Sequence, residues 1–261
     1  MTAVPIHASV GNGARFAACP LSGGGTPLQV WLAADRSLPA LDLTPCREIV
    51  VVGAHPDDET LGFGATTALL AELGVRVQVV SATDGGASYP GLSLLQRYRL
   101  EQVRRAELHR AAGILGTAAP ICLGLPDGEI ADHQERLADL LSEMLAARPP
   151  GTWCAATWRG DGHPDHEAVG RAAATAVERT GAVLVEYPVW MWHWAHPGDD
   201  RVPWNRAFRV DLPPHVGRAK AHAVRAFRSQ LVPLGPDPAD APILPPALLR
   251  RFTRPFEVVF R

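Results

Sequence analysis

The feature that most constrains the fold is the stretch 50–59, where three valines, Gly and Ala are followed by His-Pro-Asp-Asp-Glu. An unbroken apolar run of this kind is typical of a strand buried on both faces of a parallel sheet. Open α/β folds bind their ligands at the carboxyl ends of such strands. Burying one imidazole and three carboxylates costs stability, so the sequence predicts a cation or a reaction here.

Beyond this strand, segments with the pattern of strands and segments with the pattern of helices alternate along the chain. We expect strands at 49–54, 75–82, 120–125, 152–158 and 182–187, and helices at 60–73, 93–115, 132–147 and 164–180. Gly74 is expected to end the first helix, and Asp132 is a candidate N-cap for the third. The alternation predicts an α/β fold, a Rossmann-like three-layer αβα sandwich with a mostly parallel sheet.

The ends of the chain give weaker patterns. Residues 1–45 are rich in Gly, Ser, Pro and Ala, and we expect an N-terminal extension that is packed on the domain or partly mobile. Later segments are expected as follows: a strand within the extension at 28–32, an aromatic loop at 190–203, a strand at 206–212, a helix at 215–230, a loop at 233–246 and an edge strand at 256–260. Neither a repeat nor a linker is evident, so residues 46–261 are expected to form a single domain.

Composition excludes several classes of function. The chain has 261 residues, 47% of them hydrophobic, and a formal net charge of −2, which argues against a nucleic-acid scaffold or a basic membrane binder. The sequence predicts no transmembrane helix, because it lacks a window of 18 uncharged apolar residues, and no signal peptide at its N-terminus. The four widely spaced cysteines are expected to be free thiols in a reducing compartment, so we expect a cytoplasmic protein. A homo-oligomer is compatible with the sequence.

Two short clusters carry the chemistry. The first is 55–59, His-Pro-Asp-Asp-Glu, and the second is 163–166, His-Pro-Asp-His. Each follows a predicted strand and precedes a predicted helix, and in a parallel sheet such strand ends open on the same edge. Two histidines and one aspartate fit a catalytic zinc site, which keeps three protein ligands and one water. Either cluster alone is equally explained as an ordinary turn with helix capping; the presence of both favours a functional site.

These paired motifs resemble the LmbE-like, or PIG-L, family of zinc-dependent N-deacetylases. Shorter matches lie between them, at 83–85 (Thr-Asp-Gly), 104–108 (Arg-Arg-Ala-Glu-Leu) and 123–128 (Leu-Gly-Leu-Pro-Asp-Gly). The resemblance covers about residues 47–190. The paired motifs are specific, whereas each of the shorter matches is weak.

The resemblance implies a role for each residue of the two clusters. One Zn²⁺ or another divalent ion would be bound by three residues, His55, Asp58 and His166. Asp57 would act as the general base toward water. His163, oriented by Asp165, would stabilise the oxyanion or protonate the leaving amine. Glu59 would support the site or the start of the helix rather than bind the ion.

Four further residues are candidates for substrate binding: Asp84, Arg104, Asp127 and Trp194. Arg104 is equally compatible with a position on a helix surface, and Asp127 with a Pro-Asp-Gly turn. Three tryptophans at 190, 192 and 194 alternate as in a strand, so one face could stack on a sugar ring or an apolar aglycone. The alternative is that they belong to the core.

The resemblance thus implies a hydrolase that removes an N-acetyl or other N-acyl group from a small amino-sugar substrate, which could be a secondary metabolite such as a glycopeptide antibiotic. An amidase acting on thiol-sugar conjugates would use the same site. A different class, a non-catalytic Rossmann-like module that binds a nucleotide or sugar phosphate, finds support only in the Gly-Phe-Gly at 62–64. A Gly-x-Gly-x-x-Gly motif is absent, and the carboxylates would repel a phosphate.

Overall fold

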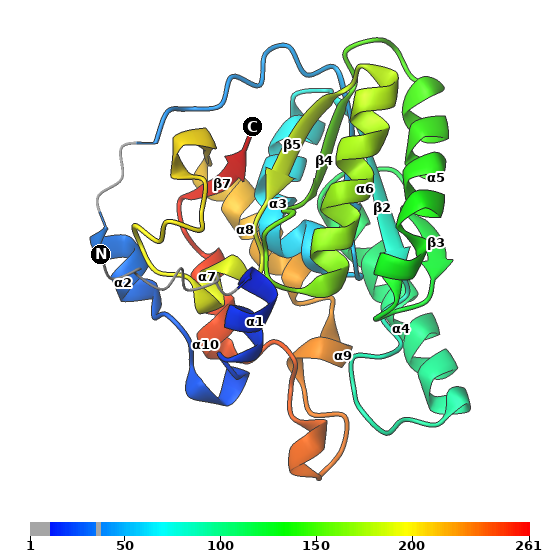
Figure 1. Ribbon diagram of the computed structural model, residues 1–261, viewed down its shortest axis with the longest axis vertical. Helices are drawn as coiled ribbons and strands as arrows, with labels where there is room; N and C mark the ends of the chain where they lie inside the picture. Colours follow the sequence, from blue (N-terminus) through cyan, green and yellow to red (C-terminus); the bar gives the residue numbers. More distant parts are fainter. Residues whose placement is uncertain (1–10, 35–37) are drawn as a thin grey trace, which may run out of the picture.

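The computed structural model describes residues 11–34 and 38–261 and contains a seven-stranded sheet covered by helices (Figure 1). The strands are β1 (Glu48–Gly53), β2 (Arg76–Thr83), β3 (Ile121–Leu125), β4 (Trp153–Thr157), β5 (Val183–Tyr187), β6 (Ala207–Asp211) and β7 (Phe256–Phe260). The helices are α1 (Asn12–Ala17), α2 (Leu28–Ala33), α3 (Asp58–Glu72), α4 (Leu94–Ile114), α5 (Gln134–Ala146), α6 (Pro164–Thr180), α7 (Met191–Trp194), α8 (Pro214–Val224), α9 (Arg228–Leu231) and α10 (Pro246–Leu249). The strand order is β3-β2-β1-β4-β5-β7-β6, and the first five of these strands are parallel.

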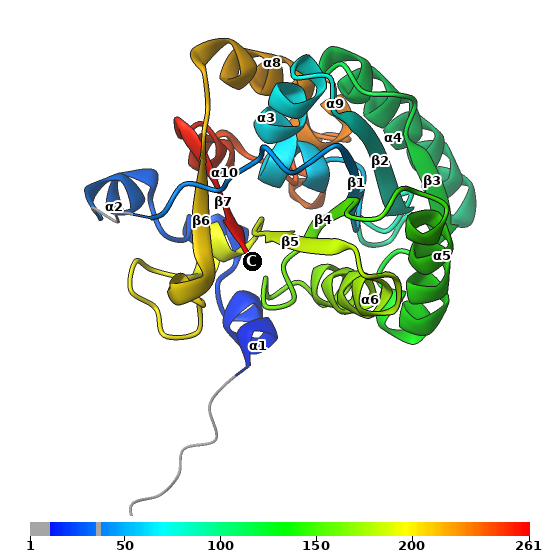
Figure 2. The same cartoon turned by 90° about the horizontal axis from the view of Figure 1, so that it is seen from above.

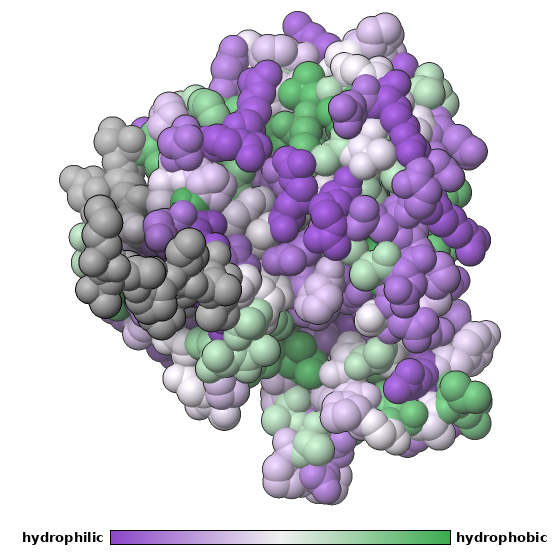
Figure 3. Space-filling model, in the orientation of Figure 1, coloured by the Kyte–Doolittle hydropathy of each residue, from purple (hydrophilic) through white to green (hydrophobic). Residues whose placement is uncertain are grey.

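The sheet divides the molecule into three layers, which confirms the predicted fold class. Seen from above, α5 and α6 cover one face of the sheet, and α3, α4 and α8 cover the other (Figure 2). The residues of β1 alternate between the two layers, because Val50 and Val52 pack in the cluster with α5 and α6, whereas Ile49 and Val51 pack in the cluster with α3. The outward sides of α5 and α6 are largely hydrophilic (Figure 3). β1 is therefore a central, fully covered strand, as its apolar run predicts.

Local signals in the sequence set most helix boundaries. Ser93 and Gln96 form a capping box at the start of α4, and Pro164 occupies the first turn of α6, whose bounds match the prediction. Gly74 follows α3 with φ of +80°, as expected for the residue that ends a helix. The predicted N-cap at Asp132 is wrong, because a 3₁₀ turn over Ile130–His133 precedes α5.

Three expectations for the less regular segments are wrong. Residues 28–32 lie in helix α2, where Trp31 packs edge-on against Trp192 with 4.9 Å between ring centroids. Residues 191–194 form the short helix α7, so the three alternating tryptophans do not share a strand face. Strand β7 is not at the edge, because it pairs antiparallel with both β5 and β6. Each of these outcomes depends on packing between distant segments, which short apolar stretches do not reveal.

The segment before β1 packs on the domain over its described residues. The guanidinium of Arg15 forms an ion pair with Asp199. The buried side chain of Arg251 donates to the carbonyl oxygens of Gly24 and of Thr26, the latter at 2.7 Å. The N-terminal residues 1–7, on which the expectation of no signal peptide rests, lie outside the described residues. Within the described part, none of the helices is long and apolar enough to cross a membrane.

Candidate metal centre and active site

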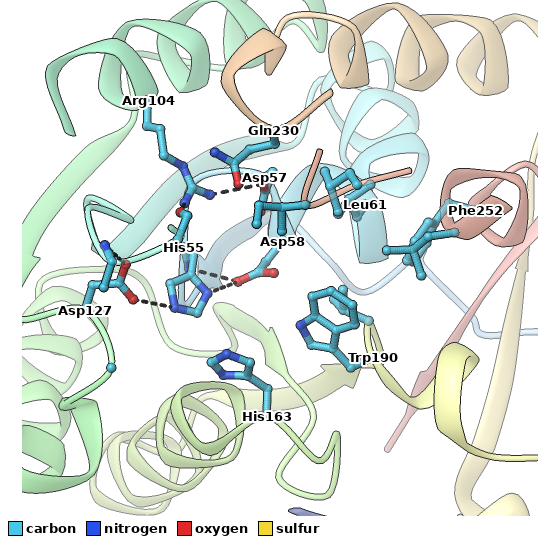
Figure 4. A pocket seen from close by; sticks show the side chains of 17 residues that line it. His55, Asp57, Asp58, Leu61, Arg104, Asp127, His163, Trp190, Gln230 and Phe252 are labelled. Carbon is cyan, nitrogen blue, oxygen red and sulfur yellow. Dashed lines mark hydrogen bonds and ion pairs between the residues drawn. The ribbon is translucent and has the colours of Figure 1, made fainter. Parts of the chain in front are cut away.

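The two predicted clusters meet at the carboxyl ends of two neighbouring strands. Residues 55–58 follow β1 and begin α3, residues 163–166 follow β4 and begin α6, and β1 and β4 pair in parallel. Figure 4 shows His55, Asp57, Asp58 and His163 pointing toward one another at this edge. The parallel sheet therefore brings together side chains about a hundred residues apart, as the sequence predicts.

Three side chains form a compact group of possible metal ligands. The Oδ2 atom of Asp58 lies 3.3 Å from Nδ1 of His55 and 3.2 Å from Nε2 of His166. One ligand atom from each of these residues lies within 4.8 Å of the other two, and all three residues are largely buried. Two imidazole nitrogens and one carboxylate oxygen are a donor set that suits Zn²⁺ and similar divalent ions.

The hydrogen bonds around the two histidines leave the right nitrogens free for such an ion. Nδ1 of His166 lies 2.8 Å from a carboxylate oxygen of Asp161, whereas its buried Nε2 has no hydrogen-bond partner. Nε2 of His55 faces Asp127 at 3.0 Å and Asp165 at 3.1 Å, which turns Nδ1 toward Asp58. Carboxylates that accept the second ring N–H of a histidine are common around protein-bound metals. The residues present therefore fit a divalent ion.

A second combination of possible ligands, His55, His163 and Asp165, fits less well. Nδ1 of His163 already accepts the backbone N–H of Asp165 at 3.2 Å. The carboxylate of Asp165 already accepts the backbone N–H groups of Gly128 and Ile130, at 2.8 and 3.2 Å. The accepting Nδ1 of His163 leaves the ring proton on Nε2, so neither ring nitrogen is free for an ion without the loss of this bond, and this set is the weaker one.

Burial and neighbouring charges perturb the acids and bases of the site. Burial raises the pKa of Asp57 to about 8, with Arg104 opposing the shift and Asp58 and Glu59 adding to it. Burial alone would lower the pKa of His166, but Asp58 and Asp161 raise it to about 9. Perturbations of this size in a cleft are typical of functional sites, and a bound cation would favour the ionised carboxylates and the neutral imidazole.

Asp57 has an unusual backbone. Its φ of +135° is the only positive φ of a non-glycine among residues 11–34 and 38–261. The conformation is held by the backbone N–H of Asp57, which donates to Glu59 at 3.1 Å, and by Arg104, which contacts the Asp57 carboxylate at 3.1 Å and the Pro56 carbonyl at 2.7 Å. Strained backbone of this kind persists only where its surroundings enforce it.

His163 is held differently from the expectation. Its ring accepts the backbone N–H of Asp165, while the Asp165 carboxylate is directed at His55. An accepting Nδ1 places the ring proton on Nε2. Burial, together with the neighbouring His166 and His55, lowers the pKa of His163 to about 3, so the ring is neutral at physiological pH. The ring is therefore a neutral N–H donor beside the three possible ligands.

A cavity of about 240 Å³ opens over this cluster. Of the four predicted substrate contacts, two line it and two do not. Arg104 and Asp127 line it (Figure 4). Arg104 is 3% exposed, so its placement on a helix surface is wrong. Asp84 does not line this cavity and instead pairs with Arg105. Trp194 does not line it either, and its indole N–H donates to the carbonyl of Asp161 at 2.7 Å.

The structure adds residues that the motifs did not reveal. Asp161 contacts His166 and also accepts the backbone N–H groups of residues 189, 190 and 191, at 2.9–3.0 Å. Trp190 lines the cavity, and Phe16 from α1 packs against Trp190 and His163, with ring centroids 5.2 and 5.9 Å apart. Gln230 of α9 lines the side of the cavity opposite His163 (Figure 4). The Gly-Asp-Gly before His163 was a signal for Asp161, but Phe16 and Gln230 have no local signal.

A parallel α/β sheet with two histidines and an aspartate at its carboxyl edge defines the class: a Rossmann-like α/β protein with a candidate metal centre. Comparisons with known proteins identify the family. Residues 50–177 match the PIG-L family, described as GlcNAc-PI de-N-acetylase. This part of the chain is therefore a domain of the PIG-L (LmbE-like) family, which confirms the resemblance.

One curated relative is the 1D-myo-inositol 2-acetamido-2-deoxy-alpha-D-glucopyranoside deacetylase of Mycobacterium sp. (strain KMS), 37% identical over 154 residues that make up 50% of each chain. The chain thus spans about half the length of the curated relatives it matches first.

Two solved structures share the fold. The N,N′-diacetylchitobiose deacetylase of Pyrococcus horikoshii is 23% identical over 72% of both chains, with a TM-score of 0.58. The 4-carboxy-2-hydroxymuconate hydratase of Pseudomonas putida KT2440 is 20% identical, with a TM-score of 0.56 and coverage of 80% of this chain and 83% of the other. Because a deacetylase and a hydratase share this fold, the reaction must be argued from the site.

Proposed function

We propose that this protein is a zinc-dependent N-deacetylase that hydrolyses the N-acetyl or other N-acyl amide of an amino-sugar substrate. The observation that carries the proposal is the buried Nε2 of His166, which has no hydrogen-bond partner and lies 3.2 Å from the Asp58 carboxylate, while Asp161 fixes the other ring nitrogen. Deacetylases of N-acetylglucosamine compounds among the relatives support the substrate class.

The roles follow from the site. His55, Asp58 and His166 would hold the ion. When bound, Zn²⁺ would supply Lewis-acid chemistry, lowering the pKa of a water and polarising the acyl carbonyl. Asp57, which lines the same cavity, accepts a proton from the attacking water.

The remaining groups act on the amide and the sugar. Neutral His163 donates its Nε2–H to the developing oxyanion, and Asp57 can return its proton to the departing amine. Arg104 holds Asp57 in place and, with Asp127, presents polar groups toward sugar hydroxyls. The products are a free amino sugar and a carboxylic acid, and a cytoplasmic location is part of this proposal.

The alternative of a phosphate-binding module loses its main support. Gly62 lies inside α3, where a Cβ atom would approach the ring of Tyr187 to 2.2 Å. This glycine is therefore required for close packing of the helix on β5, not for the approach of a phosphate. A thiol-sugar amidase would share the site, and only the range of substrates separates it from the deacetylase.

Two variants and a substrate panel test the proposal. We expect Asp58→Ala to lose bound metal and activity together, and Asp57→Asn to keep metal while kcat falls by about 10²–10⁴-fold. The assay is amine release from N-acyl glucosamines with free, lipid, inositol, thiol and glycopeptide aglycones, before and after chelation and zinc addition. Near-normal turnover in both variants, or full activity without metal, would refute the assignment.

A further inference from the structure

A second, larger cavity adjoins the candidate active site. It has a volume of about 520 Å³, in the range of cavities that hold small ligands, and it lies between α3, α8 and the segment that leads into β7. Its lining is mainly apolar, with Ala65, Val224 and Leu249 among the residues that contribute. Four cationic residues also line it: Lys220, which is paired with Glu257 at 2.7 Å, and three arginines at 218, 225 and 254.

The two cavities share a boundary. Leu61 and Phe252 line both of them. Asp58, Leu61 and Ala65 lie on one face of α3 at spacings of three and four residues, and they line the first cavity, both cavities and the second cavity respectively. At 1.5 Å per residue, the face leads about 10 Å from the possible metal ligand Asp58 into the apolar cavity.

The candidate active site is itself divided by polarity. Figure 4 shows Arg104 and Asp127 on one side of Asp58, and Leu61 and Phe252 on the other. Sugar hydroxyls match the polar side. With the scissile amide placed at the centre and its sugar on the polar side, its acyl group extends toward Leu61, Phe252 and the second cavity.

We propose that the second cavity receives the hydrocarbon chain of the substrate's N-acyl group, so that the protein removes medium- or long-chain acyl groups in preference to acetyl. The inference rests on the proposed function and adds the acyl class to it. The second cavity begins beside Leu61, about 4.5 Å along α3 from Asp58, and continues past Ala65 at about 10 Å, a distance that a two-carbon acetyl group is too short to span. The lining offers no carboxylate that would oppose the carboxylate product after hydrolysis.

Gly217 allows a specific test. It lines the second cavity within α8, and a Cβ atom added there would meet nothing within 4 Å. Gly217→Leu therefore fills the cavity without a clash at its first atom and improves helix propensity. The matched control is Gly113→Leu, also within a helix and with open space around its Cβ position, but outside the lining of both cavities.

The assay compares kcat/KM for N-octanoyl- and N-acetylglucosamine. The wild type should prefer the octanoyl substrate, with a gain of up to about fourfold per buried methylene. Gly217→Leu should reduce the ratio of kcat/KM for the octanoyl substrate to kcat/KM for the acetyl substrate at least tenfold, which corresponds to the loss of about two buried methylene groups. Gly113→Leu should leave both values unchanged. An acetyl preference in the wild type, or an unchanged ratio in Gly217→Leu, would overturn the proposal.

Two further arms separate the possible failures. An octyl glycoside of N-acetylglucosamine carries the chain on the aglycone, and a loss in Gly217→Leu confined to this compound would assign the cavity to the aglycone, against the proposal. Calorimetric binding of octanoate and acetate requires no turnover. Suppose that no amide is cleaved, but that octanoate binds more tightly than acetate to Gly113→Leu and not to Gly217→Leu. The proposed reaction then fails while the acyl-chain site stands. Equal preference for octanoate in the two variants refutes the acyl-chain site.

Discussion

The strained backbone of Asp57, the proposed general base, is expected to lower the free energy of unfolding of the protein. A residue with a Cβ atom at φ of +135° carries about 1–3 kcal/mol of strain, whereas glycine does not. We therefore compare Asp57→Ala with Asp57→Gly, since both remove the carboxylate and differ only by one methyl group. Glycine normally costs about 0.5–1 kcal/mol relative to alanine through the unfolded chain. At this position the relief of strain should win, leaving the glycine variant about 1 kcal/mol more stable.

The assay is thermal unfolding of metal-free protein followed by circular dichroism, because a bound ion would stabilise whichever variant retained it. A difference of 1 kcal/mol corresponds to a shift in Tm of roughly 2–4 °C for a chain of this size. The control applies the same pair of substitutions at exposed Asp200, where φ is not positive and glycine should be the less stable. The same order at both positions would refute the argument from strain. Both Asp57 variants should lack activity.

Three other predictions follow from contacts around the site. Asp161→Asn should weaken metal binding by about 10–100-fold, measured by competition with a chelating dye, because the carboxylate orients His166; unchanged affinity would contradict this role. Phe16→Ala should lower activity more than Phe16→Leu, with the folded structure intact by circular dichroism, since the ring supports His163; equal activities would argue against it. Burial raises the pKa of Cys154 to about 12, so its alkylation at pH 8 should be about three orders of magnitude slower than that of an exposed thiol; rapid labelling of Cys154 itself, located by peptide mass spectrometry of the native protein, would disprove it.

The sequence predicted those parts of the fold that depend on local signals. The bounds of α6 follow from a proline at its start and Gly181 at its end, where φ is +70°. Strand β1 follows from its apolar run. Residues 28–32 were misassigned because Leu-Gln-Val-Trp-Leu is a short, mostly apolar run that contains Val and Trp, which favour strands; in the folded chain these residues form a helix whose Trp31 contacts Trp192. The position of β7 inside the sheet depends on pairing with β5 and β6, which no local pattern encodes.

The same division applies to the candidate site. The residues that the structure gathers around Asp58 were predictable because each lies within a contiguous motif at a strand end. The walls of the cavity were not, because Phe16, Gln230 and Phe252 come from segments outside the motifs and carry no distinctive neighbours. The spacing of the tryptophans at 190, 192 and 194 suggested one shared strand face, which gave no reason to separate them. The structure places Trp190, directly before α7, at the cavity and Trp194 away from it.

Because of the hydrogen bonds of Asp161, the cavity wall that carries Trp190 should tolerate fewer substitutions than the wall formed by Leu61 and Phe252. One carboxylate holds both His166 and the backbone that carries Trp190, so a change that moved this wall would also disturb a proposed metal ligand. Leu61 and Phe252 line the cavity with apolar side chains that make no contact with the proposed metal ligands through hydrogen bonds or ion pairs. New substrate ranges should therefore arise by substitution on the apolar wall, where acceptance of a different acyl group does not compete with retention of the proposed metal ion.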